Sequence, residues 1–215
     1  MTESPRLLIL GLDGAPARYV FDAPPGALPN LQSLMARGMW GPLTSTIPPI
    51  TCPAWACMST SRDPGQLGLY GFRNRSSPSY GPMDRADGAW VTAPRLWEVL
   101  SDLGRRSAVL GLPLSYPCEP FNGWLIGSFL GPNDHDEYTQ PTSLADEIEE
   151  VAPGYMLDVP NFRTDDKERL LEQIRRMTDL RFRLAAHLMR SRPWDLFWMV
   201  EMGPDRMHHG FWRYG

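Results

Sequence analysis

The sequence has few cysteines, almost no lysine and no long apolar run. Its three cysteines, Cys52, Cys57 and Cys118, are an odd number without paired spacing, which excludes a disulfide framework or a zinc-finger pattern. Lys167 is the single lysine, and no block of Lys and Arg stands out in a chain of net charge −4. This argues against a nucleic-acid polymer as partner. No stretch approaches the roughly 20 apolar residues of a membrane span, so we expect no membrane association.

The composition is that of a globular protein. The 215 residues are 42% hydrophobic and 21% charged, and this length is enough for one sizeable core. The first apolar run, residues 7–12, is too short for a signal sequence and ends in an acid. Since the unpaired cysteines also fit a reducing compartment, we expect a cytoplasmic protein.

Residues 7–12 (LLILGL) form a continuous apolar run, which is typical of a parallel strand covered on both faces. Asp13 and Gly14 follow this run directly. Because ligands bind at the carboxyl ends of strands in open α/β sheets, Asp13 is a candidate site residue. The competing interpretation is a turn-forming Asp-Gly pair.

Residues 47–61 bring one hydroxyl, that of Thr51, to the start of a predicted helix. Pro53 suits the first helical position, because the N–H that proline lacks has no intrahelical acceptor there. Unpaired N–H groups and the positive end of the helix dipole would then lie beside Thr51 and favour a phosphate-like anion. Thr51 is therefore a candidate nucleophile, and a helix cap is the competing interpretation.

The apolar segment 194–202 predicts a last strand, and an acid again lies just beyond it. Asp205 and His209 are four residues apart, which places both on one face of a helical turn. A carboxylate and an imidazole together suit Zn²⁺ or Mn²⁺. A packed, hydrogen-bonded turn is the alternative interpretation of this segment.

Periodicity and turn residues predict the other elements. Helices are expected over residues 29–37, 92–103 (capped by Thr92), 143–151 and from 164 onward. Strands are expected over residues 39–45, 107–112 and 124–130. The helix that begins near Thr164 is the longest, and its apolar face comprises Leu170, Leu171, Ile174, Met177, Leu180, Leu184 and Leu188. Residues 62–92 are expected to form a long loop beside the active site.

Two loop segments hold polar side chains that suit binding. Asn74 is placed to donate its amide to a substrate oxygen, with a solvated loop asparagine as the competing interpretation. Residues 133–137 (NDHDE) have the composition of a hard-metal site. Loops are rich in such residues without binding a metal, so we favour a plain loop there.

Several segments, taken in order, resemble the alkaline phosphatase superfamily. The resemblance is closest to its type I phosphodiesterase/nucleotide pyrophosphatase branch and to the predicted phosphohydrolases and phosphomutases. The segments are residues 10–14 (LGLDG), 29–31 (PNL), 41–43 (GPL), 49–55 (PITCPAW) and 205–212 (DRMHHGFW), the last similar to the group's Asp-x-x-x-His metal segment. The resemblance implies an α/β fold whose central sheet is mostly parallel and sandwiched between helices.

The same resemblance implies a metal-dependent phosphoester hydrolase with a small-molecule phosphoester as substrate. Asp13 and Thr51 would bind one divalent metal ion, and Asp205 and His209 the other. Two Zn²⁺ ions are expected, with Mn²⁺ as the alternative. Thr51 would attack phosphorus and form a phosphothreonine that is then hydrolysed.

The resemblance also implies substrate contacts from the backbone N–H of Cys52 and the amide of Asn74. Sulfatases share the superfamily fold but use a Cys-x-Pro-x-Arg motif. Here Thr51 and Trp55 occupy the two ends of that pattern, which favours phosphate over sulfate esters. A phosphomutase on the same fold is an alternative activity.

The four candidate ligands are fewer than a two-metal site needs, because each zinc takes about three ligands from protein. The family completes both sites with a later Asp-His pair and a further His, which have no counterpart up to residue 215. We therefore expect residues 1–215 to be a single, incomplete alkaline phosphatase-like catalytic domain that lacks its C-terminal part. A non-catalytic fragment or a degenerate binding relative is the alternative of a different class.

Overall fold

A five-stranded sheet forms the centre of the structure, a computed structural model that describes residues 5–131 and 138–214. Its strands, in spatial order, are β1 (Leu7–Leu12), β7 (Leu196–Glu201), β4 (Ser107–Leu110), β5 (Gly123–Ile126) and β6 (Thr139–Gln140). All neighbours are parallel except β5 and β6, which are antiparallel. The mostly parallel sheet predicted from the sequence is therefore confirmed.

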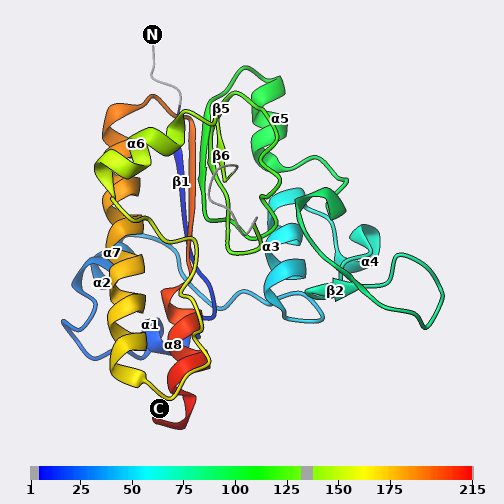
Figure 1. The fold of residues 1–215 in the computed structure, drawn as a ribbon. Helices are drawn as coiled ribbons and strands as arrows, with labels where there is room; N and C mark the ends of the chain where they lie inside the picture. Colours follow the sequence, from blue (N-terminus) through cyan, green and yellow to red (C-terminus); the bar gives the residue numbers. More distant parts are fainter. Residues whose placement is uncertain (1–4, 132–137, 215) are drawn as a thin grey trace.

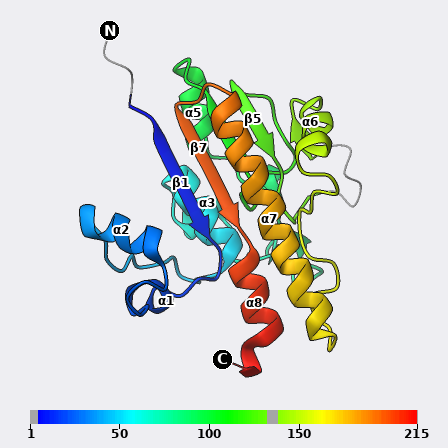
Figure 2. The ribbon, with the colours of Figure 1, turned by 90° about the vertical axis from the view of Figure 1, so that its left-hand side faces the viewer.

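Helices cover both faces of this sheet, as Figures 1 and 2 show from two sides. On one face lie α6 (Leu144–Val151) and the long α7 (Lys167–Ser191); on the other lie α3 (Thr51–Thr60) and α5 (Leu96–Asp102). The chain also forms α1 (Arg18–Phe21), α2 (Pro29–Arg37), α4 (Pro64–Leu67), α8 (Gly203–Phe211), the 3-10 turns η1 (Gly88–Trp90) and η3 (Trp212–Tyr214), and a small antiparallel pair, β2 (Arg73–Asn74) and β3 (Asp84–Arg85).

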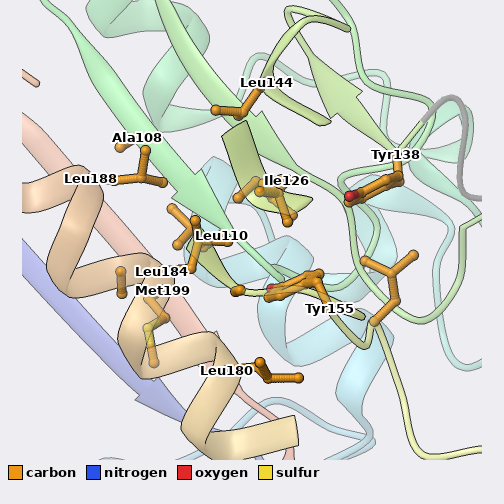
Figure 3. Packing of buried hydrophobic residues seen from close by; sticks show 14 of the residues in the cluster. Ala108, Leu110, Ile126, Tyr138, Leu144, Tyr155, Leu180, Leu184, Leu188 and Met199 are labelled. Carbon is orange, nitrogen blue, oxygen red and sulfur yellow. The ribbon is translucent and has the colours of Figure 1, made fainter. Parts of the chain in front are cut away.

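The alternating side chains of β7 serve two core clusters. Phe197 and Met199 belong to the cluster under α6 and α7, whereas Trp198 packs in the second cluster, which also contains Trp97 of α5. Figure 3 shows the first cluster, in which apolar α7 side chains face those of β4 and β5. The apolar face predicted for α7 is buried as expected except at Leu171, which is partly exposed. Strand β7 is thus buried on both faces, and its carboxyl end leads directly into α8.

Strand β1 differs from the prediction, because it is not covered on both faces. Leu7, Leu8 and Leu10 remain 51%, 49% and 47% exposed, and within the described residues β1 pairs with β7 alone. An apolar run identifies a strand but does not show which element covers it. Here the run belongs to an edge of the sheet.

Other elements were predicted with small errors. The prediction of a strand over residues 39–45 is wrong, since the chain there forms neither helix nor strand. Helix α5 begins at Leu96 rather than near Thr92, because Arg95 is its N-cap and the Glu98 carboxylate accepts the Arg95 backbone N–H at 2.8 Å. Strands β4 and β5 end earlier than expected, and the loop 62–92 contains α4, β2, β3 and η1. The segment 133–137 lies outside the described residues.

The long helix begins three residues later than expected. Its N-cap is Asp166, whose side chain accepts the backbone N–H of Arg169 at 3.1 Å, rather than Thr164. In the part of the chain that the structure describes, no helix is long and apolar enough to cross a membrane.

Candidate active site

Two acids meet where β1 and β7 end. Asp13 follows β1, and its backbone N–H donates to the Glu201 carbonyl at 3.0 Å. Asp205 lies in the first turn of α8, which continues directly from β7. Gly14 has a left-handed φ of +66°, and a Cβ atom there would lie only 2.9 Å from the Asp205 Cα and 3.2 Å from its Oδ1. The glycine therefore lets the chain after β1 pack directly on Asp205, so that the two acids are neighbours.

The environment of Asp13 opposes its negative charge. Burial is the largest cause and the charge of Asp205 the second, and together they raise the pKa of Asp13 from 3.8 to about 6. Hydrogen bonding by the side chains of Trp55 and Thr51, and the charge of Arg206, lower it in part. The Oδ2 atom of Asp13 is buried without a hydrogen-bond partner among the described residues. A buried carboxylate oxygen without a partner calls for an explanation, and a cation at this position would supply one.

Helix α3 brings Thr51 to Asp13. Thr51 is the first helical residue, the N-cap is Ile50, and no side chain caps this helix. Pro53 is therefore the third helical residue rather than the first, which is equally permitted because the first four N–H groups of a helix lack intrahelical acceptors. The Thr51 hydroxyl does not act as a cap, and its hydrogen bond to Asp13 is one of the causes that lower the pKa of that acid.

Gly11 explains how α3 approaches the sheet so closely. A Cβ atom at this position of β1 would lie 2.4 Å from the ring of Trp55 in α3. The ring thus occupies the space that any larger residue would fill. Gly11 and Gly14 together set the distances from β1 to α3 and to α8.

Asp205 and His209 lie on one face of α8, as their spacing predicts. The His209 Nε2 atom is 3.5 Å from Asp205 Oδ1, and the histidine side chain is 52% exposed. The neighbouring His208 instead stacks on Tyr19, with ring centroids 5.6 Å apart, and contacts Trp212. Only the second histidine of the tandem pair therefore accompanies the acid.

Of the two groups predicted to contact the substrate, the Cys52 backbone N–H has no acceptor within its helix, whereas the Asn74 amide already bonds to its own loop. Cys52 is the second residue of α3, so its backbone N–H has no acceptor within the helix. Burial, followed by the charge of Asp13, raises the pKa of the Cys52 thiol to about 12, so the thiol stays neutral. The Asn74 amide is engaged in its own loop: Oδ1 accepts the Tyr70 N–H at 2.7 Å, and Nδ2 donates to the Gly71 carbonyl at 2.8 Å. Substrate binding by Asn74 stays a prediction and would use its second amide hydrogen.

Sequence reasoning missed two charged residues beside this site. Arg206 is 4% exposed, donates from Nε and Nη2 to both oxygens of Asp158, and donates from Nη1 to Asp205 Oδ2. Arg206 stands inside the segment that drew attention to Asp205, but a single sequence shows no sign of its partner. Asp158 lies in the connection between α6 and α7, far from both strand ends in sequence.

The side chains that could bind divalent metal ions lie in two pairs, and neither pair alone provides all the ligands of a metal site. Within residues 5–131 and 138–214, no three His, Cys, Asp or Glu side chains converge as a metal-binding group. The available donors are Asp13 with Thr51, and Asp205 with His209. Asp13, Asp158 and Asp205 together carry more negative charge than Arg206 balances, and the unpartnered Oδ2 atom belongs to Asp13. A cation fits this environment.

Comparison with known proteins agrees with the geometry. Residues 7–214 match the family model of type I phosphodiesterase / nucleotide pyrophosphatase. The chain belongs to this family. The resemblance stated from the sequence motifs is thereby confirmed.

Solved structures support the same fold. Two structures of phosphonoacetate hydrolase from Sinorhizobium meliloti 1021, in complex with phosphonoacetate and with phosphonoformate, are similar, each with a TM-score of 0.61. Sequence identities are 18% and 17%, and the match covers 94% and 98% of this chain but 47% and 52% of theirs. The chain thus spans about half the length of these structures. Comparison with the curated proteins gives no match.

Proposed function

We propose that this protein is a metal-dependent phosphoester hydrolase of the phosphodiesterase/nucleotide pyrophosphatase type, with Thr51 as nucleophile. The observation that carries the proposal is the meeting of Thr51, Asp13 and Asp205 at the start of α3 and the ends of β1 and β7. Family membership supports phosphoester chemistry. The activity is proposed for the whole protein, since these residues span about half of the similar structures.

Two divalent ions, Zn²⁺ or alternatively Mn²⁺, would be held by Asp13 with Thr51 and by Asp205 with His209. Such ions, when bound, lower the pKa of a ligating hydroxyl and neutralise charge on phosphoryl oxygens. The donors available from this chain fit them because they are carboxylate, hydroxyl and imidazole groups. Further ligands from the rest of the protein are part of the proposal.

In the proposed reaction, each residue of the site has a separate role. Asp13 orients the Thr51 hydroxyl, which loses its proton to solvent as its oxygen forms a bond to phosphorus. The bond from phosphorus to the leaving oxygen breaks at the same time, and that oxygen leaves as the anion or takes a proton from solvent. The N-terminal N–H groups of α3, including that of Cys52, stabilise the non-bridging oxygens. Water then cleaves the phosphothreonine and releases phosphate or a phosphate monoester.

The test is turnover of bis(p-nitrophenyl) phosphate by variants of the zinc-loaded protein. Thr51→Ala should lose at least about 10³-fold in kcat, because removing a nucleophile removes the covalent route. Thr51→Ser should retain part of the activity. Thr60→Ala is the matched control on the same helix, since its hydroxyl bonds only to local backbone. Wild-type rates in Thr51→Ala would refute the assignment.

The substrate is proposed as a small phosphoester. Phosphonoacetate deserves inclusion in the same assay, because the similar hydrolase was solved with it. Release of phosphate, or of a phosphate monoester from a diester, separates hydrolysis from the alternative phosphomutase activity, which would move the group within the substrate. Zinc binding without turnover of any of these compounds would instead favour a non-catalytic binding protein.

A further inference from the structure

Arg206 is a buried cation whose guanidinium group contacts two carboxylates and two aromatic rings. Its Nε and Nη2 atoms lie 2.6 and 2.7 Å from the two carboxylate oxygens of Asp158, which is a bidentate pair. Its Nη1 atom donates to Asp205 Oδ2. Aromatic rings flank the guanidinium, with the centroid of Phe162 at 4.4 Å and that of Phe129 at 5.1 Å. Such packing fixes the plane of the guanidinium group.

The position of Arg206 gives the two carboxylate oxygens of Asp205 different surroundings. Its Oδ2 is taken by Arg206, whereas Oδ1 points toward His209, 3.5 Å from the Nε2 atom. The carboxylate is thus held in one orientation, with one oxygen bound and the other beside the imidazole. Metal-ligating carboxylates are commonly hydrogen-bonded in this way by a second layer of residues, which sets their orientation.

Arg206 also allows two acids to stand side by side. Its charge lies close enough to Asp13 and Asp205 to interact with both. The guanidinium is itself fixed from outside, because Asp158 belongs to neither β1 nor α8 and its Oδ1 also accepts the Val159 N–H at 2.7 Å. Without Asp158, nothing else described here holds the Nε and Nη2 edge of Arg206.

We propose that Asp158 and Arg206 form a clamp that positions Asp205 to bind a divalent metal ion through Oδ1 together with His209. Both are positioning residues: neither touches the ion or the substrate. The inference rests on the proposed function, which places a metal ion at Asp205 and His209. It concerns the affinity for that ion and not the rate of the chemical step. It assigns a role to a residue 47 positions away from Asp205 in the sequence.

The experiment measures zinc affinity by competition with a chromophoric chelator, in Asp158→Asn and wild type. Loss of the bidentate pair should weaken zinc binding by about 10- to 100-fold, the usual effect of losing a second-layer partner. At saturating zinc, kcat for bis(p-nitrophenyl) phosphate should return close to the wild-type value, because Asp158 touches no reacting atom. A purely structural role would not give this rescue by zinc.

Two further variants keep the test decisive. Glu147→Gln is the matched control, since it breaks another arginine–carboxylate pair, with Arg192, outside the site; it should leave zinc affinity unchanged. Arg206→Lys keeps the charge but loses the planar fork, and it should weaken zinc binding as Asp158→Asn does, which covers the case that Asp158→Asn fails to fold.

The outcomes separate the clamp from the proposed function. Unchanged zinc affinity in Asp158→Asn and Arg206→Lys would overturn the clamp while leaving the hydrolase standing. Tight zinc binding that the clamp variants weaken, in a protein without phosphoesterase activity, would support the clamp and refute the function. A wild-type protein that binds no zinc overturns the clamp.

Discussion

Replacing Asp13 by asparagine should stabilise the metal-free protein at alkaline pH. Asparagine keeps the shape of the side chain and can still accept the hydrogen bonds of Trp55 and Thr51. It removes the charge that burial and Asp205 oppose in the folded state. The substitution therefore separates the electrostatic cost of the acid from its packing.

The magnitude follows from the pKa of Asp13, which is about 6 in the folded protein against an ordinary value of 3.8. The folded state binds this proton more tightly than the unfolded state, so the free energy of unfolding falls as pH rises from about 4 to about 6 and stays lower above that range. A difference of about 2 pKa units corresponds to about 3 kcal/mol. In a protein of this size, that is a shift in Tm of about 6 to 12 °C.

The assay is urea unfolding of wild type and Asp13→Asn with a chelator present, at pH 4, 6 and 8. We expect nearly equal stability at pH 4 and a variant more stable by about 3 kcal/mol at pH 8. Added zinc should reverse the order at pH 8, because an ion that binds only the folded wild type stabilises it. A stability difference that does not depend on pH would refute the reasoning.

Two other substitutions probe the framework of the site. Gly14→Ala should lower the free energy of unfolding by about 1–3 kcal/mol more than Gly26→Ala. Both glycines have φ above +60°, but a Cβ atom at Gly14 would meet the α8 backbone, whereas one at Gly26 would have open space. Thermal unfolding measures both variants, and equal losses of stability would contradict the close approach of Gly14 to α8. Glu201→Gln should cost about 3–5 kcal/mol, because it removes the carboxylate that balances the charge of the buried Arg181, which otherwise bonds to backbone carbonyls. Glu147→Gln, at a partly exposed pair, should cost at most about 1 kcal/mol. Similar losses of the two variants in urea unfolding would argue against a buried pair.

Local patterns predicted several of the elements that carry the candidate site residues. Apolar runs located β1 and β7, and the acid that follows each strand could be read directly from the sequence. The four-residue spacing of Asp205 and His209 gave their shared helical face. A helix beginning close to Thr51 was also predicted from Pro53, although it starts at Thr51 itself, two residues earlier than expected. These features depend only on residues close together in the chain.

Features that depend on distant partners could not be predicted. β1 was expected to be buried, but its coverage depends on which segments pack against it, and Leu7, Leu8 and Leu10 are half exposed. The pairing of Asp158 with Arg206 joins residues 48 positions apart, and no periodicity announces it. The expected strand over 39–45 is also absent, because a short apolar pattern does not show whether the segment will pair with another strand.

Anomalous diffraction at the zinc absorption edge, on crystals of the zinc-loaded protein, tests the central claim most directly. The account predicts one zinc ion with Asp13 and Thr51 among its ligands, and a second with Asp205 and His209. An enzyme that is active with zinc but shows no zinc at these four residues would contradict it.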